Sequence, residues 1–140
     1  MAQSQFEGPI TAGTVWENAS ANIGKVILHQ SVSISQTASG TTSKTIIVPA
    51  SSRIVAIYAD VAAAYNGSTS PLTVGTSAGG EQFAPSTTCQ TAGRIAMTFT
   101  AAQLTLWANV TTNTSIIATM ISTGTVTAGT VIVHVFYVQN

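Results

Sequence analysis

Alternation of apolar and polar residues dominates this chain from residue 25 onward. Over 25–34 apolar side chains recur at nearly every second position, which predicts a half-buried strand. The segments 53–61 and 131–138 are apolar at consecutive positions, so both of their faces are expected to be covered, as in central strands of a sheet. In 53–61, strict alternation would place Ile54, Ala56 and Tyr58 on one face. Further short strands are predicted over 45–48, 72–74, 94–99 and 115–122.

Turn and cap signals separate these segments. Asn66-Gly67 is a strong turn signal, and the glycine-containing stretch 75–90, which includes Pro85, reads as a loop. Thr100 is followed three residues later by Gln103, a capping-box pattern that predicts one or two helical turns. Seven or eight short strands with turns between them indicate an all-β fold. We expect an antiparallel β-sandwich with jelly-roll-like connectivity.

The first 24 residues lack a sustained period. Four glycines or prolines interrupt isolated apolar residues, so this part is expected to be an extended N-terminal arm, with 25–140 as the sandwich domain. Phe6 and Trp16 are costly to leave in water and need a surface to cover them. The sequence leaves open whether the arm docks on a partner or folds back onto its own domain.

Charge is unusually scarce in this chain of 140 residues. Asp, Glu, Lys and Arg make up 6% of it, against about 25% in ordinary domains, and the formal net charge is zero. Polar positions are filled instead by 23 Thr and 15 Ser. A neutral surface favours association. Four scattered cations cannot form a phosphate-binding stripe, so nucleic acid is not expected as a partner.

Membrane and secretion signals are also missing from the sequence. No run of 18 apolar residues and no polybasic cluster occurs, so we expect no membrane association. The N-terminus lacks the basic and apolar regions of a secretory signal, which suggests a product made and kept in a cytoplasm. Cys89 is the only cysteine, which excludes an intrachain disulfide; we expect it in a small polar pocket or at the surface.

Few residues could support catalysis. His29 falls on the polar face of its predicted strand, whereas His134 lies on an apolar face, and their spacing matches no metal-binding motif. Asp60 is expected to pair with Arg53 or Arg94 rather than to act as a catalytic acid. We therefore predict that the protein is not an enzyme and has no catalytic residues, no cofactor and no metal site.

Several stretches spread over nearly the whole chain carry a further signal, although no single motif is diagnostic. They are SQFEGPI at 4–10, NIGKVIL at 22–28, LTVGT at 72–76, AGR at 92–94, AGTV at 128–131 and YVQN at 137–140. Taken together, these stretches resemble the small virion structural proteins of tailed bacteriophages, of the capsid decoration or cement type.

This resemblance implies a structural protein on the outer surface of a phage head. Such a protein is made in the host cytoplasm and stabilises the virion by bridging subunits of the major capsid protein, commonly as a homotrimer. In such proteins a terminal arm often connects neighbouring capsid subunits. The resemblance assigns capsid contact to the arm residues Phe6, Pro9, Ile10 and Trp16.

A second function remains open at this point, a head-fibre or tail adhesin module that binds a host glycan or receptor. Trp16, Tyr58, Tyr65 and Trp107 could stack on sugar rings, although aromatic residues serve core packing more often.

Overall fold

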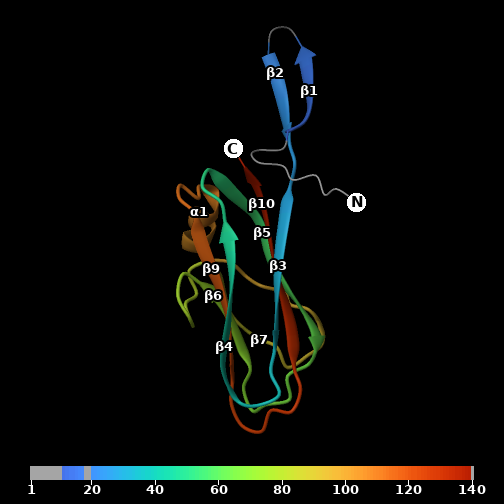
Figure 1. The fold of residues 1–140 in the computed structure, drawn as a ribbon, viewed down its shortest axis with the longest axis vertical. Coiled ribbons are helices and arrows are strands. Elements are labelled where there is room, and N and C mark those ends of the chain that lie inside the picture. Colours follow the sequence, from blue (N-terminus) through green and yellow to red (C-terminus); the bar gives the residue numbers. More distant parts are fainter. Residues whose placement is uncertain (1–10, 18–19, 140) are drawn as a thin grey trace, which may run out of the picture.

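The computed structural model describes residues 11–17 and 20–139, with side chains from residue 25 onward. Within these residues, two four-stranded antiparallel sheets pack against each other, which confirms the all-β sandwich predicted from the sequence (Figure 1). The first sheet has the order β3 (Leu28–Ser35), β10 (Thr130–Gln139), β5 (Ser52–Ala63), β8 (Gly93–Arg94). The second sheet has the order β4 (Gly40–Val48), β9 (Thr114–Ser122), β6 (Pro71–Gly75), β7 (Ala84–Thr88).

Consecutive strands alternate between the two sheets. From β3 to β10, every connection except β6–β7 leads from one sheet to the other. This places β10 and β5 at central positions of the first sheet, as their two-sided apolar sequences predicted. The jelly-roll connectivity expected from the sequence stays a prediction.

The core is the space between the sheets, filled by alternate residues of facing strands. On β10, Val131, Val133 and Val135 are fully buried, and the intervening residues point to the opposite face. On β9 the inward residues are Ile116, Ala118 and Met120, also fully buried. The period-two pattern therefore positions the core in both strands as predicted.

A bulge in β5 changes which of its residues face the core. Ala56 pairs with Phe136 and Ile54 with Tyr137, so one extra residue of β5 is accommodated between them. Because of this insertion Ile54 and Ile57 both point inward, whereas strict alternation had placed Ile54 with Ala56 and Tyr58. The assignment of faces from alternation is therefore wrong for Ile54 and holds only within each half of the strand.

Two segments differ from the predicted elements. Strand β7 lies inside the stretch expected to be a loop; it is an edge strand, where Pro85 removes no hydrogen bond that a neighbour requires. Conversely, only Gly93–Arg94 pairs as β8, and 95–99 has no strand assignment although Ile95, Met97 and Phe99 pack against the core. Alternation of apolar and polar residues indicates that one side of a segment is buried. An extended segment can bury one side in this way without pairing with a neighbouring strand.

The short helix α1 (Ala101–Ala108) begins with the predicted capping box. Gln103 N–H donates to the Thr100 hydroxyl, and the Thr100 N–H donates to the Gln103 side-chain oxygen. The helix also holds the β6–β7 loop, since Gln103 Nε2 donates to the Glu81 carbonyl at 2.8 Å and Trp107 Nε1 donates to the Phe83 carbonyl at 3.1 Å.

Two glutamines close one side of the sandwich, where the edge strands β3 and β4 lie. Gln30 Nε2 donates to the backbone carbonyl of Ile47 at 3.0 Å and to the Tyr137 hydroxyl at 2.9 Å. Gln36 Nε2 donates to the Gly40 carbonyl at 3.1 Å, and its side-chain oxygen accepts from Ser122 at 2.6 Å. These amides join the two sheets along an edge that no strand covers in the described part of the chain.

Within the predicted arm, the structure forms a hairpin. Strands β1 (Thr11–Glu17) and β2 (Ser20–Lys25) pair antiparallel as a separate two-stranded sheet, which projects beyond one end of the sandwich (Figure 1). The division into an N-terminal arm at 1–24 and a sandwich domain at 25–140 stays a prediction. We call the end from which this hairpin projects the hairpin end.

Cys89 is fully buried in the core, so its expected placement in a polar pocket or at the surface is wrong. Burial raises the pKa of its thiol to about 12. Its backbone N–H donates to the Ser70 carbonyl at 2.9 Å. Cys89 is a structural core residue and is held as a neutral thiol.

Candidate functional site

The outward face of the first sheet carries a cluster of aromatic rings. Strand register creates it, because Phe136 of β10 lies opposite His29 of β3, and His134 of β10 lies opposite Tyr58 of β5. All four side chains lie on the sheet surface that faces away from the core. We call His29, Tyr58, His134 and Phe136 the ring cluster.

Neighbouring rings in the cluster are nearly parallel. The interplanar angles range from 17° to 28°. The centroid distances are 4.5 Å for His29–Phe136, 4.9 Å for Tyr58–His134, 5.2 Å for His29–His134 and 5.4 Å for Tyr58–Phe136. These spacings are those of offset aromatic stacking, which fixes the orientation of each ring on an otherwise open sheet face.

An ion pair closes the cluster on its β8 side. Arg94 donates to both carboxylate oxygens of Asp60, at 2.9 Å and 3.1 Å, and its guanidinium lies 4.0 Å from the centre of the Tyr58 ring. The hydrogen bond from Arg94 lowers the pKa of Asp60, and the same bond raises the pKa of Arg94. Both groups stay charged and neutralise each other, so the cluster carries no net charge from this pair.

The two histidines form a hydrogen bond with each other. His29 Nε2 lies 2.9 Å from His134 Nδ1, and the Asp60 carboxylate lies 3.5 Å from the other nitrogen of His134, Nε2. Burial lowers the pKa of His134, against the opposing effect of the Asp60 charge. This lowering favours the neutral form of the His134 ring, and the tautomer of each ring decides which one donates the hydrogen bond between them.

Sequence reasoning found part of this site. The predicted pairing of Asp60 with Arg94 is confirmed, whereas no contact joins Asp60 to Arg53 among the described interactions. The separation of His29 and His134 into a polar and an apolar face is wrong, because both rings lie on the same face. Only the register between β3 and β10 brings them together, and the sequence carried no signal for that register.

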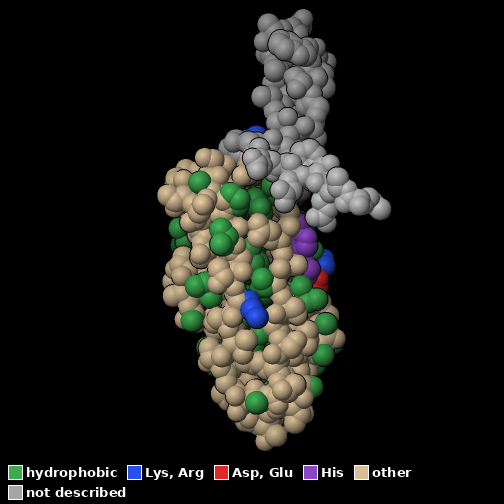
Figure 2. All heavy atoms as spheres, viewed as in Figure 1, with side chains coloured by type: hydrophobic (Ala, Val, Ile, Leu, Met, Phe, Trp, Pro, Cys, Tyr) green, Lys and Arg blue, Asp and Glu red, His purple; other side chains and the backbone are tan. Residues whose placement is uncertain are grey.

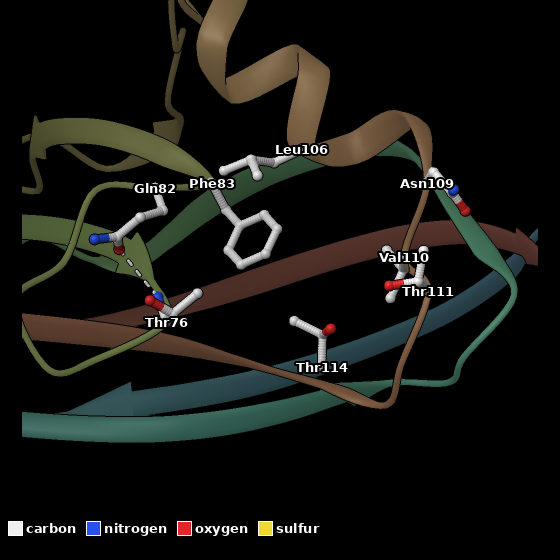
Figure 3. Close-up of a pocket in the computed structure, with 8 residues that line it drawn as sticks. All are labelled: Thr76, Gln82, Phe83, Leu106, Asn109, Val110, Thr111 and Thr114. Atoms are coloured by element: carbon white, nitrogen blue, oxygen red, sulfur yellow. Dashed lines mark hydrogen bonds between the residues drawn. The ribbon is translucent and has the colours of Figure 1, made fainter.

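A small pocket lies beside α1. It is a pocket of about 310 Å³ between the end of the helix, the β6–β7 loop and the start of β9 (Figure 3). Phe83, Val110 and the half-exposed Leu106 give it an apolar lining, and Gln82 Oε1 accepts from the Thr76 N–H at its border. The remaining lining residues are Asn109, Thr111 and Thr114. Its size lies at the lower limit for small-molecule sites, and it contains no charged side chain.

The aromatic residues considered for sugar stacking are placed differently from one another. Tyr65 is 1% exposed and Trp107 is 8% exposed, so both belong to the core and are unavailable for stacking on a ligand. Tyr58 remains at the surface, in the ring cluster. Trp16 lies on β1 opposite Ala21, and its side chain is outside the described part of the chain.

The other predicted arm contacts, Phe6, Pro9 and Ile10, lie outside the described residues, so their role stays a prediction. Within the described residues, no helix has the length and apolar character needed to cross a bilayer. Comparison with known proteins adds no relative: no family model, no curated protein and no solved structure matches this chain.

Proposed function

We propose that this chain is a structural virion protein of the capsid decoration or cement type, which binds the outside of a phage head and bridges subunits of the major capsid protein. The proposal follows the resemblance noted in the sequence. It is supported by a rigid sandwich with an appended hairpin, a shape suited to attachment at more than one point. Since each copy would bind many times over one particle, individually weak contacts would suffice.

The observation that carries the proposal is the exposure of large aliphatic side chains at the hairpin end. Ile27 precedes β3 and Ile47 lies near the end of β4, and they are 58% and 56% exposed. Leu104 and Leu106 of α1 are 47% and 48% exposed, and α1 lies at the same end of the sandwich (Figure 1). Removing apolar surface from water is favourable by about 25 cal/mol per Å². A partner surface that covers these residues would therefore be stabilised by their burial.

The sparse charge of the surface supports the same kind of contact. On the face in Figure 2, charged side chains are few: a basic and an acidic group lie side by side at the edge, and the others are separated by neutral polar and apolar groups. Attachment to a neutral protein surface would depend on apolar burial and hydrogen bonds rather than on steering by charge. We therefore expect attachment to change little between low and high ionic strength.

Co-sedimentation with capsids that lack the protein tests this proposal. The full chain should saturate the particles at a defined stoichiometry and raise the temperature at which they rupture. Leu104→Ser combined with Leu106→Ser should weaken attachment at least tenfold, while Ala102→Ser on the same helix should bind normally. Failure of the unaltered chain to associate with capsids would overturn the proposal.

Trimer formation belongs to the same proposal and has a separate measurement. Sedimentation equilibrium of the purified chain should give three times the 14.3 kDa mass of one copy. A chain that is monomeric both free and on the particle would remove the trimer from the proposal, without affecting attachment itself.

The ring cluster favours the second function, an adhesin module that binds a host glycan. Tyr58 and Phe136 present apolar rings beside the Arg94–Asp60 pair, which could hydrogen-bond sugar hydroxyls. Binding of a glycan by the full chain, lost in Tyr58→Ala and kept in Leu106→Ser, would support this function. A screen in which Tyr58→Ala binds every glycan as the unaltered chain does would remove it.

A further inference from the structure

We propose that His29 and His134 form a two-imidazole site for a divalent transition-metal ion, with Cu²⁺ preferred over Ni²⁺ and Zn²⁺. The site would lie on the open face of the first sheet, joining edge strand β3 to central strand β10. Its remaining ligands would be water, because no group of three or more His, Cys, Asp or Glu side chains gathers as ligands in the described part of the chain.

The distance between the two nitrogens matches adjacent ligands of one metal ion. Two imidazole nitrogens at about 2.05 Å from a metal and about 90° apart lie about 2.9 Å from each other. His29 Nε2 and His134 Nδ1 are 2.9 Å apart. The preference for Cu²⁺ follows from the general order of affinities of divalent metal ions for nitrogen ligands, in which Cu²⁺ stands above both Ni²⁺ and Zn²⁺.

The Asp60 carboxylate selects the tautomer of His134 that the site needs. Its position 3.5 Å from Nε2 favours the ring proton there and leaves the Nδ1 lone pair facing His29. A carboxylate behind a metal-binding histidine is the usual outer-shell arrangement. Arg94 holds that carboxylate in place through two hydrogen bonds.

Metal binding requires only a small rearrangement. With the His134 ring proton on Nε2, facing Asp60, His134 Nδ1 is the acceptor and His29 Nε2–H is the donor in the metal-free protein. On binding, the His29 proton moves through solvent to Nδ1 of the same ring, both imidazoles stay neutral, and the two lone pairs turn toward the ion. His29 is exposed and lies on an edge strand, so its ring can leave its stack on Phe136 and turn toward the ion.

Among the described residues, few other groups could compete for the ion. The chain has only two histidines, so removal of either one eliminates half of its imidazole ligands. Cys89, the single thiol, is fully buried and its raised pKa keeps it protonated. A change in affinity on replacing His29 therefore reports on this pair.

Titration calorimetry of the tag-free full chain with CuCl₂, NiCl₂ or ZnCl₂ at pH 7.5 tests the proposal. We expect one saturable ion per chain, tightest for Cu²⁺, and an affinity at least tenfold lower in His29→Gln and in His134→Gln. Ser31→Ala, on the same face and opposite His134 on the neighbouring strand, should bind as the unaltered chain does. Asp60→Asn should weaken binding about tenfold, as for other outer-shell carboxylates.

Paramagnetic resonance of the Cu²⁺ complex supplies a readout that does not depend on affinity. The unaltered chain should show two equatorial imidazole nitrogens, and His29→Gln should show one. The proposal is overturned if the unaltered chain binds no ion saturably, if its Cu²⁺ spectrum shows a single imidazole, or if His29→Gln binds as tightly as the unaltered chain.

Discussion

The hydroxyl of Tyr65 donates a hydrogen bond of 2.7 Å to the backbone carbonyl of Ile34, between the segment that follows β5 and the end of β3. Both residues are buried, Tyr65 to 1% exposure and Ile34 completely. The backbone N–H of Tyr65 in turn donates to the Cys89 carbonyl at 3.0 Å. Tyr65 thereby fixes three distant parts of the chain at the end of the sandwich opposite the hairpin.

Tyr65→Phe should lower the free energy of unfolding by about 1–2 kcal/mol, because the Ile34 carbonyl loses a buried donor while the ring stays in place. Urea denaturation measures this change. Tyr137→Phe is the comparison, since its hydroxyl accepts from Gln30 at a part-buried site and should cost less. Equal losses in the two variants would contradict the role assigned to Tyr65.

Gly129→Ala should destabilise the fold by more than about 2 kcal/mol, because an added Cβ would collide with the Tyr65 ring. The same substitution made in a Tyr65→Ala background should cost at least about 1 kcal/mol less, since the clashing ring atoms, Cγ included, are gone. Thermal or urea unfolding of the four proteins gives the coupling. Strict additivity would show that Gly129 is needed for another reason.

Thr100→Ala should cost about 1 kcal/mol by removing the cap of α1. Gln103→Ala should cost more, because Gln103 is buried and also donates to the Glu81 carbonyl of the β6–β7 loop. Urea unfolding ranks the two variants. Proteolysis of the β6–β7 loop should accelerate in Gln103→Ala and stay nearly unchanged in Thr100→Ala.

Alkaline pH should destabilise the protein through Cys89 and Tyr65. Burial raises both pKa values to about 12, from ordinary values of 9.0 and 10.0. The folded state therefore keeps protons that the unfolded chain releases, so this contribution is complete below pH 9 and is lost as pH rises toward 12. Each group should add a slope of up to about 1.4 kcal/mol per pH unit. Cys89→Ala should flatten the decline of the free energy of unfolding between pH 9 and 10, as measured by urea denaturation. An unchanged slope would contradict the contribution assigned to Cys89.

The inward positions of β9 and β10 could be predicted from the sequence because alternation reports burial directly. Ile116 and Val133 fall where the pattern places them. The same logic fails at Ile54, since a bulge shifts the alternation by one residue and leaves no mark in the apolar pattern. The strand β7 was missed because Pro85 and nearby glycines resemble a loop when the edge position of the strand is unknown.

The candidate site was harder to predict than the fold. The sequence limited the partner of Asp60 to Arg53 or Arg94, because the chain has few cationic side chains. The structure shows that the partner is Arg94. The contact between His29 and His134 depends on long-range register, because 105 positions separate the two residues. Composition and local spacing contain no information about that pairing.

Gln30 bears on how the molecule avoids polymerising. Edge strands β3 and β4 lie side by side, and a charge-poor chain rich in Thr has little repulsion to prevent its sheets from continuing into those of another copy. The Gln30 amide occupies the Ile47 carbonyl, an acceptor that an incoming strand would otherwise use. One of the backbone groups through which a second copy could extend the sheet is thus already bonded, by a neutral side chain rather than by a charged one.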